Sequence, residues 1–173
     1  FDVTNKTICE LGAGAGLPSM CCCISNAKNV VATDYPDDYL VDNLKYNVEK
    51  YNNAHAAGFM WGKDPSPILS LNNNEKFDIL ILSDVIFNHT VHNQLLKSVV
   101  DLMKENGFAL VLYTHHRTHL VKEDLEFFKI AENDFNLTWK EVDTVKHPPM
   151  FVDVGNMDLR TTAHVGFLTF KQK

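Results

Sequence analysis

Short apolar runs alternate with amphipathic segments along this chain, and that alternation limits its possible folds more than any other feature. Five runs are typical of strands, and they cover residues 6–11, 29–34, 56–61, 76–84 and 107–116. Helical patterns follow most of them, at residues 18–27, 36–51, 91–102 and 120–134. In the second helical segment, for example, Leu40, Leu44 and Val48 recur on one helical face. This order predicts βαβ units, which build a mostly parallel sheet covered by helices on both faces.

The last part of the chain departs from the alternation. Two further extended runs, residues 137–145 and 162–170, follow without a clear helix between them. We therefore expect an antiparallel hairpin that closes the sheet. A chain of 173 residues can bury one sizeable core, and no linker or internal repeat divides it. The prediction is a single α/β domain over residues 1–173, with a Rossmann-like, doubly wound sheet of seven strands.

The overall charge narrows the choice of partners. The formal net charge is −6, whereas binding to a nucleic-acid backbone requires a basic surface. An acidic surface suits a basic protein partner, although the same charge also serves ordinary solubility. No apolar run reaches the ~20 residues that span a bilayer, so we expect no membrane association.

Three adjacent cysteines, Cys21, Cys22 and Cys23, fall in the first helical segment. Neighbours on a helix point about 100° apart, so the three cannot face one metal ion. We expect them to be reduced, buried packing residues of an intracellular protein. The chain begins with Phe1 rather than methionine, and we expect that an N-terminal segment has been removed. The prediction is a cytoplasmic monomer.

A glycine-rich turn follows the first predicted strand. The sequence ELGAGAG places Glu10 before Gly12, Gly14 and Gly16. Glycine permits positive φ angles and the close approach of a ligand to the backbone. The acidic residue disfavours a phosphate and suits a cationic amino acid group, while Asp34, which ends the second strand, is placed to bind ribose hydroxyls. A ligand with a ribose, an amino acid group and no phosphate is S-adenosylmethionine, which we predict as the cofactor. A generic turn with a capping aspartate is the alternative.

Two further strand ends contribute polar and aromatic residues. Trp61, at the end of the third strand, is placed to stack on adenine or else belongs to the core. The fourth strand ends in SDVIF, where Ser83 is assigned to the cofactor and Asp84 and Phe87 to the chemistry. A carboxylate orients the N–H of an amine, and an aromatic ring stabilises positive charge beside it. This pair favours methylation of nitrogen.

Histidines gather in two stretches, NHTVH and HHRTH, after the fourth and fifth strands. Two of the pairs have a spacing that one helical turn could use for a metal ion, but nothing supplies a convincing further ligand, so we predict no metal site. Asn88, His115, His116 and Arg117 are expected to line the substrate entrance, on the same edge of the sheet as Asp84. Hydrogen bonding within a loop is the alternative for His115, His116 and Arg117.

Taken together, these motifs resemble the seven-stranded, class I methyltransferases, and among them the lysine methyltransferases called methyltransferase family 16. The stretches ELGAGAGLPS, TDYPD, SDVIFNHTVH, YTHHR and PMF are similar to the fungal branch first named nicotinamide N-methyltransferase. The resemblance implies an enzyme that methylates the N-terminal glycine and an adjacent lysine of translation elongation factor 1-alpha. It also implies a preceding N-terminal segment that helps to cover the cofactor.

Two enzymatic functions stay open at this point. Methylation of a protein amine is the leading interpretation, and methylation of a pyridine such as nicotinamide is the alternative. A third interpretation is a module that binds the cofactor without enzymatic activity. The acidic residues Asp37, Asp38 and Asp153, in or beside predicted loops, favour a basic protein partner. Asp84 is assigned to orientation of the amine rather than to proton abstraction, because a nearby carboxylate raises the pKa of a lysine.

Overall fold

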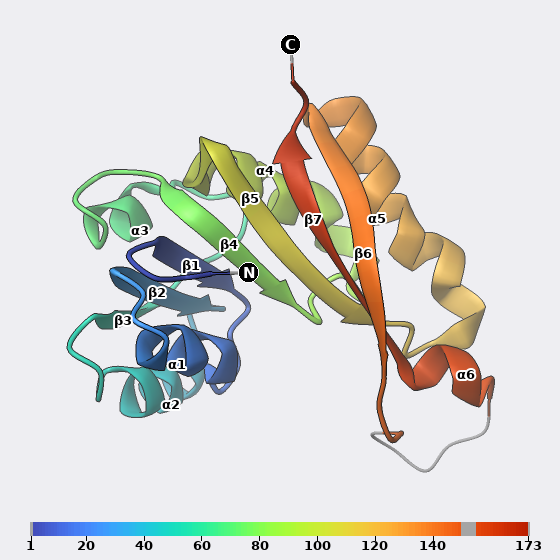
Figure 1. Ribbon diagram of the computed structural model, residues 1–173, viewed down its shortest axis with the longest axis horizontal. Coiled ribbons are helices and arrows are strands. Elements are labelled where there is room, and N and C mark those ends of the chain that lie inside the picture. Colours follow the sequence, from blue (N-terminus) through green and yellow to red (C-terminus); the bar gives the residue numbers. More distant parts are fainter. Residues whose placement is uncertain (1, 150–154, 173) are drawn as a thin grey trace.

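The computed structural model describes residues 2–149 and 155–172. Its strands form a seven-stranded sheet in the order β3-β2-β1-β4-β5-β7-β6 (Figure 1). The strands are β1 Thr7–Leu11, β2 Asn29–Asp34, β3 Ala54–Gly58, β4 Phe77–Ser83, β5 Met103–Thr114, β6 Leu137–Lys146 and β7 Thr162–Phe170. The α-helices are α1 Leu17–Ile24, α2 Asp38–Val48, α3 Ser66–Ser70, α4 His92–Leu102, α5 Val121–Asp134 and α6 Met157–Arg160. Two short 3-10 helices, η1 His89–Val91 and η2 Thr118–Leu120, precede α4 and α5.

The pairing of the strands defines where the chain reverses direction across the sheet. β1 pairs in parallel with β2 on one side and with β4 on the other. The order of the strands therefore reverses between β1 and β4, the place at which ligands bind in sheets of this kind. β7 runs antiparallel between β5 and β6. The predicted doubly wound α/β fold with an antiparallel C-terminal hairpin is confirmed.

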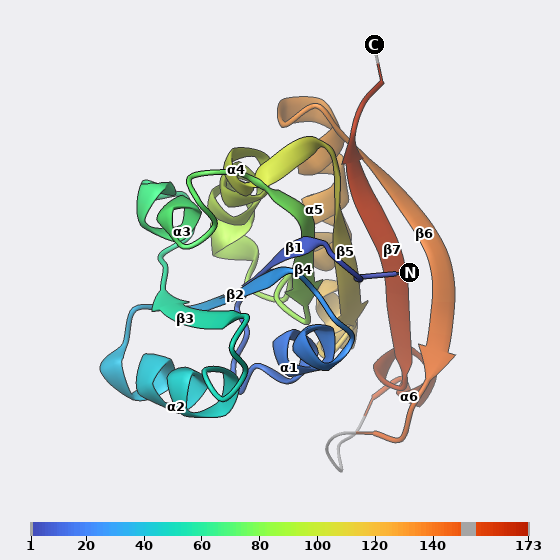
Figure 2. The same ribbon diagram turned by 60° about the vertical axis from the view of Figure 1, so that its left-hand side comes forward.

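Each face of the sheet packs against its own set of helices. Alternate residues of a strand point to opposite faces. Ile8 of β1 therefore packs in one core with Leu44 of α2, whereas the next residue, Cys9, packs in a second core with Leu95 of α4 and Phe127 of α5. In Figure 2, α1 and α2 lie together beneath β1, β2 and β3, while α4 and α5 lie beside β4 and β5.

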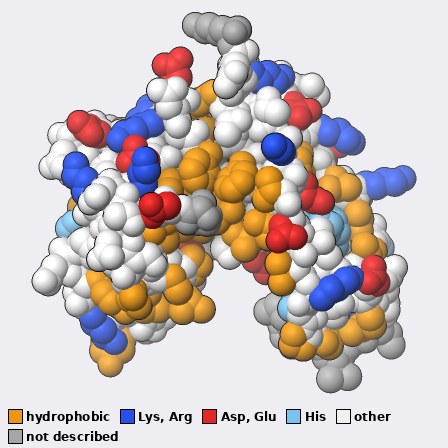
Figure 3. Space-filling view, in the orientation of Figure 1, with side chains coloured by type: hydrophobic (Ala, Val, Ile, Leu, Met, Phe, Trp, Pro, Cys, Tyr) orange, Lys and Arg blue, Asp and Glu red, His pale blue; other side chains and the backbone are white. Residues whose placement is uncertain are grey.

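Hydrophobic side chains also gather over β4, β5 and β7 on the sheet face that is turned to the viewer in Figure 3. Phe108 of β5 packs against the core on the α1 side. Its ring meets that of Phe167 of β7 edge to face, with the ring centroids 5.0 Å apart. Both phenylalanines are half-buried. In the view of Figure 1, α4 lies behind this part of the sheet, and α5 lies to the right of β6.

Two strands differ from the prediction by more than one residue. The third strand is Ala54–Gly58, whereas the sequence predicts residues 56–61. β3 is an edge strand that pairs with β2, and this pairing ends where Gly58 lies opposite Asp34, so the chain turns away after Gly58. β5 begins earlier than predicted, directly after α4, because Met103 already pairs with Phe77.

The three adjacent cysteines differ in their exposure to solvent. Cys22 and Cys23 are buried as expected, but Cys21 is exposed, because a helix turns by about 100° per residue.

Asp37 and Asp38 lie at the start of α2, where Asp37 caps the helix, while Asp153 lies outside the described residues. No helix among the described residues is long and apolar enough to cross a membrane.

Candidate functional site

The turn after β1 requires its three glycines for different reasons. Gly12, Gly14 and Gly16 have φ angles of 77°, 55° and 81°, in the left-handed region that favours glycine. A Cβ atom on Gly12 would lie 2.7 Å from Val85 and 3.1 Å from Trp61, so these side chains press directly on the backbone. A Cβ on Gly14 would meet nothing within 4 Å.

Gly16 contacts the neighbouring helix. A Cβ atom there would come within 2.7 Å of both Leu44 and Val48 of α2. This third glycine therefore allows α2 to pack closely on the start of α1, and it does not line the cavity described below. The close packing of α2 on the start of α1 is sufficient to explain why residue 16 is a glycine.

Asp34 at the end of β2 ties this turn to the next loop. One carboxylate oxygen accepts a hydrogen bond from the backbone N–H of Gly14 at 2.6 Å, and the other accepts one from the N–H of Tyr35 at 2.6 Å. A carboxylate offers about four acceptor positions, so two further donors can still be bound. Asp34 is half-buried and lines the cavity, so these positions can be reached by a ligand.

A cavity of about 720 Å³ lies at the carboxyl ends of the strands, where the strand order reverses. Its volume falls within the range of roughly 300–1,000 Å³ that is typical of small-molecule sites. Six of the residues predicted from the sequence line it, namely Gly12, Asp34, Trp61, Asp84, Phe87 and Asn88. The other lining residues are Tyr35, Phe59, Met60, Lys63, Val85, Val91 and Gln94. Four separate loops thus converge on one site.

Glu10 lies beneath the turn rather than in the cavity. Its side chain is 1% exposed, and one oxygen accepts hydrogen bonds from the backbone N–H of Ser19 at 3.0 Å and from the Ser19 hydroxyl at 2.5 Å. Burial raises the pKa of this carboxyl to about 7, against the opposing effect of the two hydrogen bonds. In this arrangement Glu10 connects β1 to α1, and its assignment to the cofactor stays a prediction.

The loop after β4, residues 84–91, forms the opposite wall and is called the substrate loop below. It opens on a strained residue, because Asp84 has a φ angle of 58°. The Asp84 carboxylate is bound by His116, whose Nε2 lies 2.8 and 2.7 Å from its two oxygens. The Phe87 ring is 48% exposed, and its carbonyl accepts a hydrogen bond from the Arg117 guanidinium at 2.5 Å. Asn88 caps η1 through its side-chain oxygen.

The two histidines directly after β5, which the sequence interpretation places together at the substrate entrance, point in different directions. His115, predicted at the substrate entrance, is 3% exposed and its Nδ1 lies 2.7 Å from Asp124 of α5. His116 is the residue that reaches Asp84. Both histidines lie beyond the last strand residue, Thr114, in a tight turn in which the backbone N–H of His116 donates a hydrogen bond to the Thr114 carbonyl at 3.0 Å. Of the remaining predicted residues, Ser83 ends β4 without lining the cavity.

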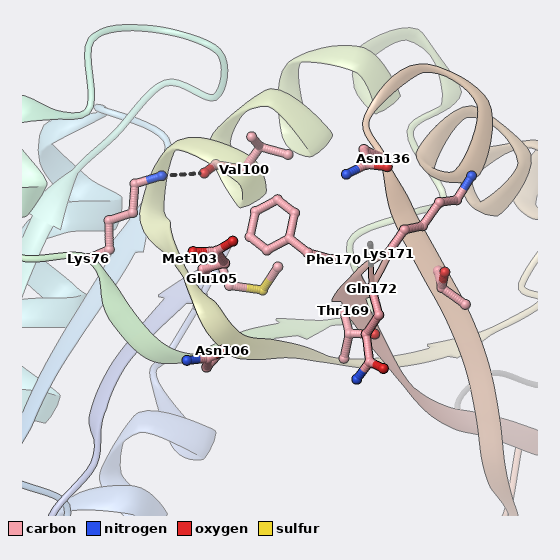
Figure 4. A pocket seen from close by; sticks show the side chains of 12 residues that line it. Lys76, Val100, Met103, Glu105, Asn106, Asn136, Thr169, Phe170, Lys171 and Gln172 are labelled. Atoms are coloured by element: carbon pink, nitrogen blue, oxygen red, sulfur yellow. Dashed lines mark hydrogen bonds between the residues drawn. The ribbon is translucent and has the colours of Figure 1, made fainter.

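A second cavity, of about 990 Å³, lies at the other end of the sheet (Figure 4). It is lined by residues from the starts of β4 and β5 and from the end of β7, including Lys76, Met103 and Phe170. The Lys76 ammonium donates a hydrogen bond to the Val100 carbonyl there. Ligands of parallel α/β sheets bind at the carboxyl ends of the strands, so the 720 Å³ cavity is the candidate site.

Comparison of the sequence with known families and proteins points to one group. Residues 2–134 match the family model described as lysine methyltransferase. The chain is 41% identical over 177 residues to the protein N-terminal and lysine N-methyltransferase EFM7 of Debaryomyces hansenii, covering 96% of this chain and 69% of that protein. It is 43% identical over 172 residues to the protein of the same name from Schizosaccharomyces pombe, covering 94% of this chain and 67% of that protein.

Comparison of the structure supports the same fold. A TehB-like SAM-dependent methyltransferase from Corynebacterium glutamicum superimposes with a TM-score of 0.63 at 17% identity, covering 97% of this chain and 82% of that chain. At this level of identity the likeness concerns the fold alone.

Proposed function

Because this chain belongs to the lysine methyltransferase family, we propose that it is an S-adenosylmethionine-dependent protein N-methyltransferase whose substrate is elongation factor 1-alpha. The N-terminal amine and a nearby lysine of that factor are the proposed acceptors, and the enzyme is proposed to work as a cytoplasmic monomer. The observation that carries the proposal is the cavity in which Asp34 lies on one wall and Asp84 and Phe87 lie on the other.

The residues of the cavity fit the proposed cofactor. Asp34 retains acceptor positions for two ribose hydroxyls, since its present bonds to Gly14 and Tyr35 use only part of its capacity. Met60 and Trp61 supply an apolar and aromatic wall suited to a purine. Gly12 also lines the cavity, and its lack of a side chain leaves room for Val85 and Trp61 against the turn. The bound cofactor supplies a methyl group on a positively charged sulfur.

Asp84 and Phe87 are proposed to hold the amine that receives the methyl group. The Asp84 carboxylate accepts a hydrogen bond from the amine N–H, while His116 keeps that carboxylate in place. The exposed ring of Phe87 covers the amine and excludes water. The carboxylate raises the pKa of an amine and the apolar ring lowers it, so the pair orients the nitrogen more than it deprotonates it. An α-amino group, with a pKa of roughly 8, needs less help than lysine, at about 10.4.

The rim of the cavity suits a protein substrate better than a small ring. The Asp84 side chain is 42% exposed and Phe87 projects into solvent, so the acceptor side is open. Asp37 and Asp38 add negative charge at the start of α2, next to the cavity residue Tyr35. Together with the net charge of −6, this rim attracts a basic segment of polypeptide. Nicotinamide, which is neutral, would gain nothing from it.

The test supplies methyl-labelled cofactor with elongation factor 1-alpha in one reaction and with nicotinamide in another. We expect label on the N-terminal region of the protein, located by mass spectrometry, and none on nicotinamide. Asp84→Ala should lower turnover about tenfold or more through loss of orientation, while Asp101→Ala, which removes an exposed ion pair with Lys97 on α4, should not. Label on nicotinamide alone would refute the proposal.

A further inference from the structure

A buried carboxylate connects α5 to two histidines that have no part in the chemistry proposed above. Asp124 of α5 is 4% exposed. One of its oxygens lies 2.7 Å from Nε2 of His89, and the other lies 2.7 Å from Nδ1 of His115. An ionised carboxylate only accepts hydrogen bonds, so both rings donate to it. The three side chains thus join the substrate loop, the end of β5 and α5 in one network.

Asp124 remains charged in this position. Burial alone would raise the pKa of its carboxyl, but the hydrogen bonds from His115 and His89 outweigh that effect and hold the pKa below its usual value. Hydrogen bonds to an ionised acceptor are stronger than neutral ones. Removal of the carboxylate would leave two imidazole N–H groups without their acceptor, one of them on the buried His115.

The network acts at the far end of the substrate loop. His89 begins η1, two residues after Phe87. Its ring also packs edge to face on His92, with the centroids 5.5 Å apart, and Nε2 of His92 lies 2.7 Å from the Ile86 carbonyl. The loop is therefore anchored by His116 at its start and by Asp124, through His89, at its end. Phe87 lies between these anchors.

We propose that Asp124 is a positioning residue of the enzyme, which holds the substrate loop so that Asp84 and Phe87 face the amine. The proposal deepens the proposed function and rests on it for the chemical step. The turn that carries Gly14 and the residue Asp34, which are proposed to bind the cofactor, are bonded to each other and not to this network. Loss of Asp124 should therefore impair turnover and leave cofactor binding intact.

The test compares Asp124→Ala, Asp124→Asn and the control Glu126→Ala, which removes an exposed ion pair with Lys129 on the same helix. We expect Asp124→Ala to speed hydrogen–deuterium exchange in residues 84–91 but not in residues 12–16, and to lower kcat about 10- to 100-fold. The calorimetric Kd of the cofactor should stay within about twofold of wild type, because Asp34, Met60 and Trp61 lie outside the substrate loop. Asp124→Asn should recover most of kcat, since an amide can accept from one ring and donate to the other once that second ring adopts its other tautomer. Glu126→Ala should match wild type in all three measurements.

Two results would overturn the proposal. One is unchanged exchange of residues 84–91 in both Asp124 variants. The other is faster hydrogen–deuterium exchange throughout the chain together with a higher Kd of the cofactor. That result would mean that Asp124 only stabilises the fold. Exchange and calorimetry need no acceptor, so they decide the proposal even when wild-type enzyme leaves elongation factor 1-alpha unlabelled, a result that would refute the proposed function by itself.

Discussion

Replacement of Glu10 by glutamine should change how the stability of this protein depends on pH. The Glu10 carboxyl is buried against Ser19, and burial raises its pKa from 4.5 to about 7 in the folded protein. The folded state therefore binds a proton more tightly than the unfolded state does. The stabilisation that this proton provides is complete below pH 4.5 and is lost as the pH rises through about 7.

The magnitude follows from the difference between the two pKa values. Each pKa unit corresponds to about 1.4 kcal/mol, so ionisation of Glu10 should cost the folded protein about 3 kcal/mol above pH 7. Glutamine carries no titratable proton, and its amide oxygen can still accept both hydrogen bonds from Ser19. Any fixed cost of the substitution, such as an unpaired amide N–H, is the same at every pH.

The assay is urea unfolding of wild type and Glu10→Gln at several pH values between 4.5 and 8, without cofactor. The free energy of unfolding of the variant minus that of wild type should increase by about 3 kcal/mol across this range, with most of the change between pH 5 and about 7. Glu126→Gln serves as the control for the same substitution at the surface, since Glu126 is half-exposed beside Lys129. If the difference in the free energy of unfolding between Glu10→Gln and wild type did not change with pH, the reasoning would be refuted. Glu10 would then have the same pKa in the folded and unfolded states.

Three other predictions concern the turn, the cofactor and the substrate. Gly16→Ala should lower the free energy of unfolding by about 3 kcal/mol, because the new Cβ would lie 2.7 Å from Leu44 and the φ angle is unfavourable for alanine. Gly14→Ala should lower it by only about 1 kcal/mol, because only the φ angle is unfavourable there. Chemical denaturation of both variants checks this difference. Asp34→Ala should weaken cofactor binding by about 2–4 kcal/mol in calorimetry, and an unchanged Kd would remove the residue from the site. Methylation of elongation factor 1-alpha should slow as ionic strength rises, because salt screens attraction to the acidic rim over about 10 Å, and a rate independent of salt would argue against steering by charge.

Much of this fold could be predicted from the chain because local patterns decide it. Strand-like runs of six to ten residues alternate with helical periods, and this alternation is enough to favour a parallel sheet with helices on both faces. The position of β7 between β5 and β6 could not be predicted in the same way. Two antiparallel strands can add to a sheet edge in either order, and the choice depends on pairing across the sheet. The end of β3 at Gly58 likewise depends on where its partner strand stops.

In the candidate site, too, some features could be predicted from the sequence and others only from the tertiary structure. Gly12, Asp34 and Asp84 could be expected to meet, because each follows or ends a parallel strand and all such ends lie on one edge of the sheet. The directions of individual side chains could not be read from the order of residues. Glu10 lies in the motif but turns beneath it toward Ser19, and His115 turns inward while His116 turns to Asp84. The sequence by itself thus determined which residues reach this edge of the sheet, since strand ends are local features. Only the tertiary structure decided which of them face the cavity, because that depends on how the chain turns after each strand and on partners such as Asp124 of α5, which are distant in the sequence.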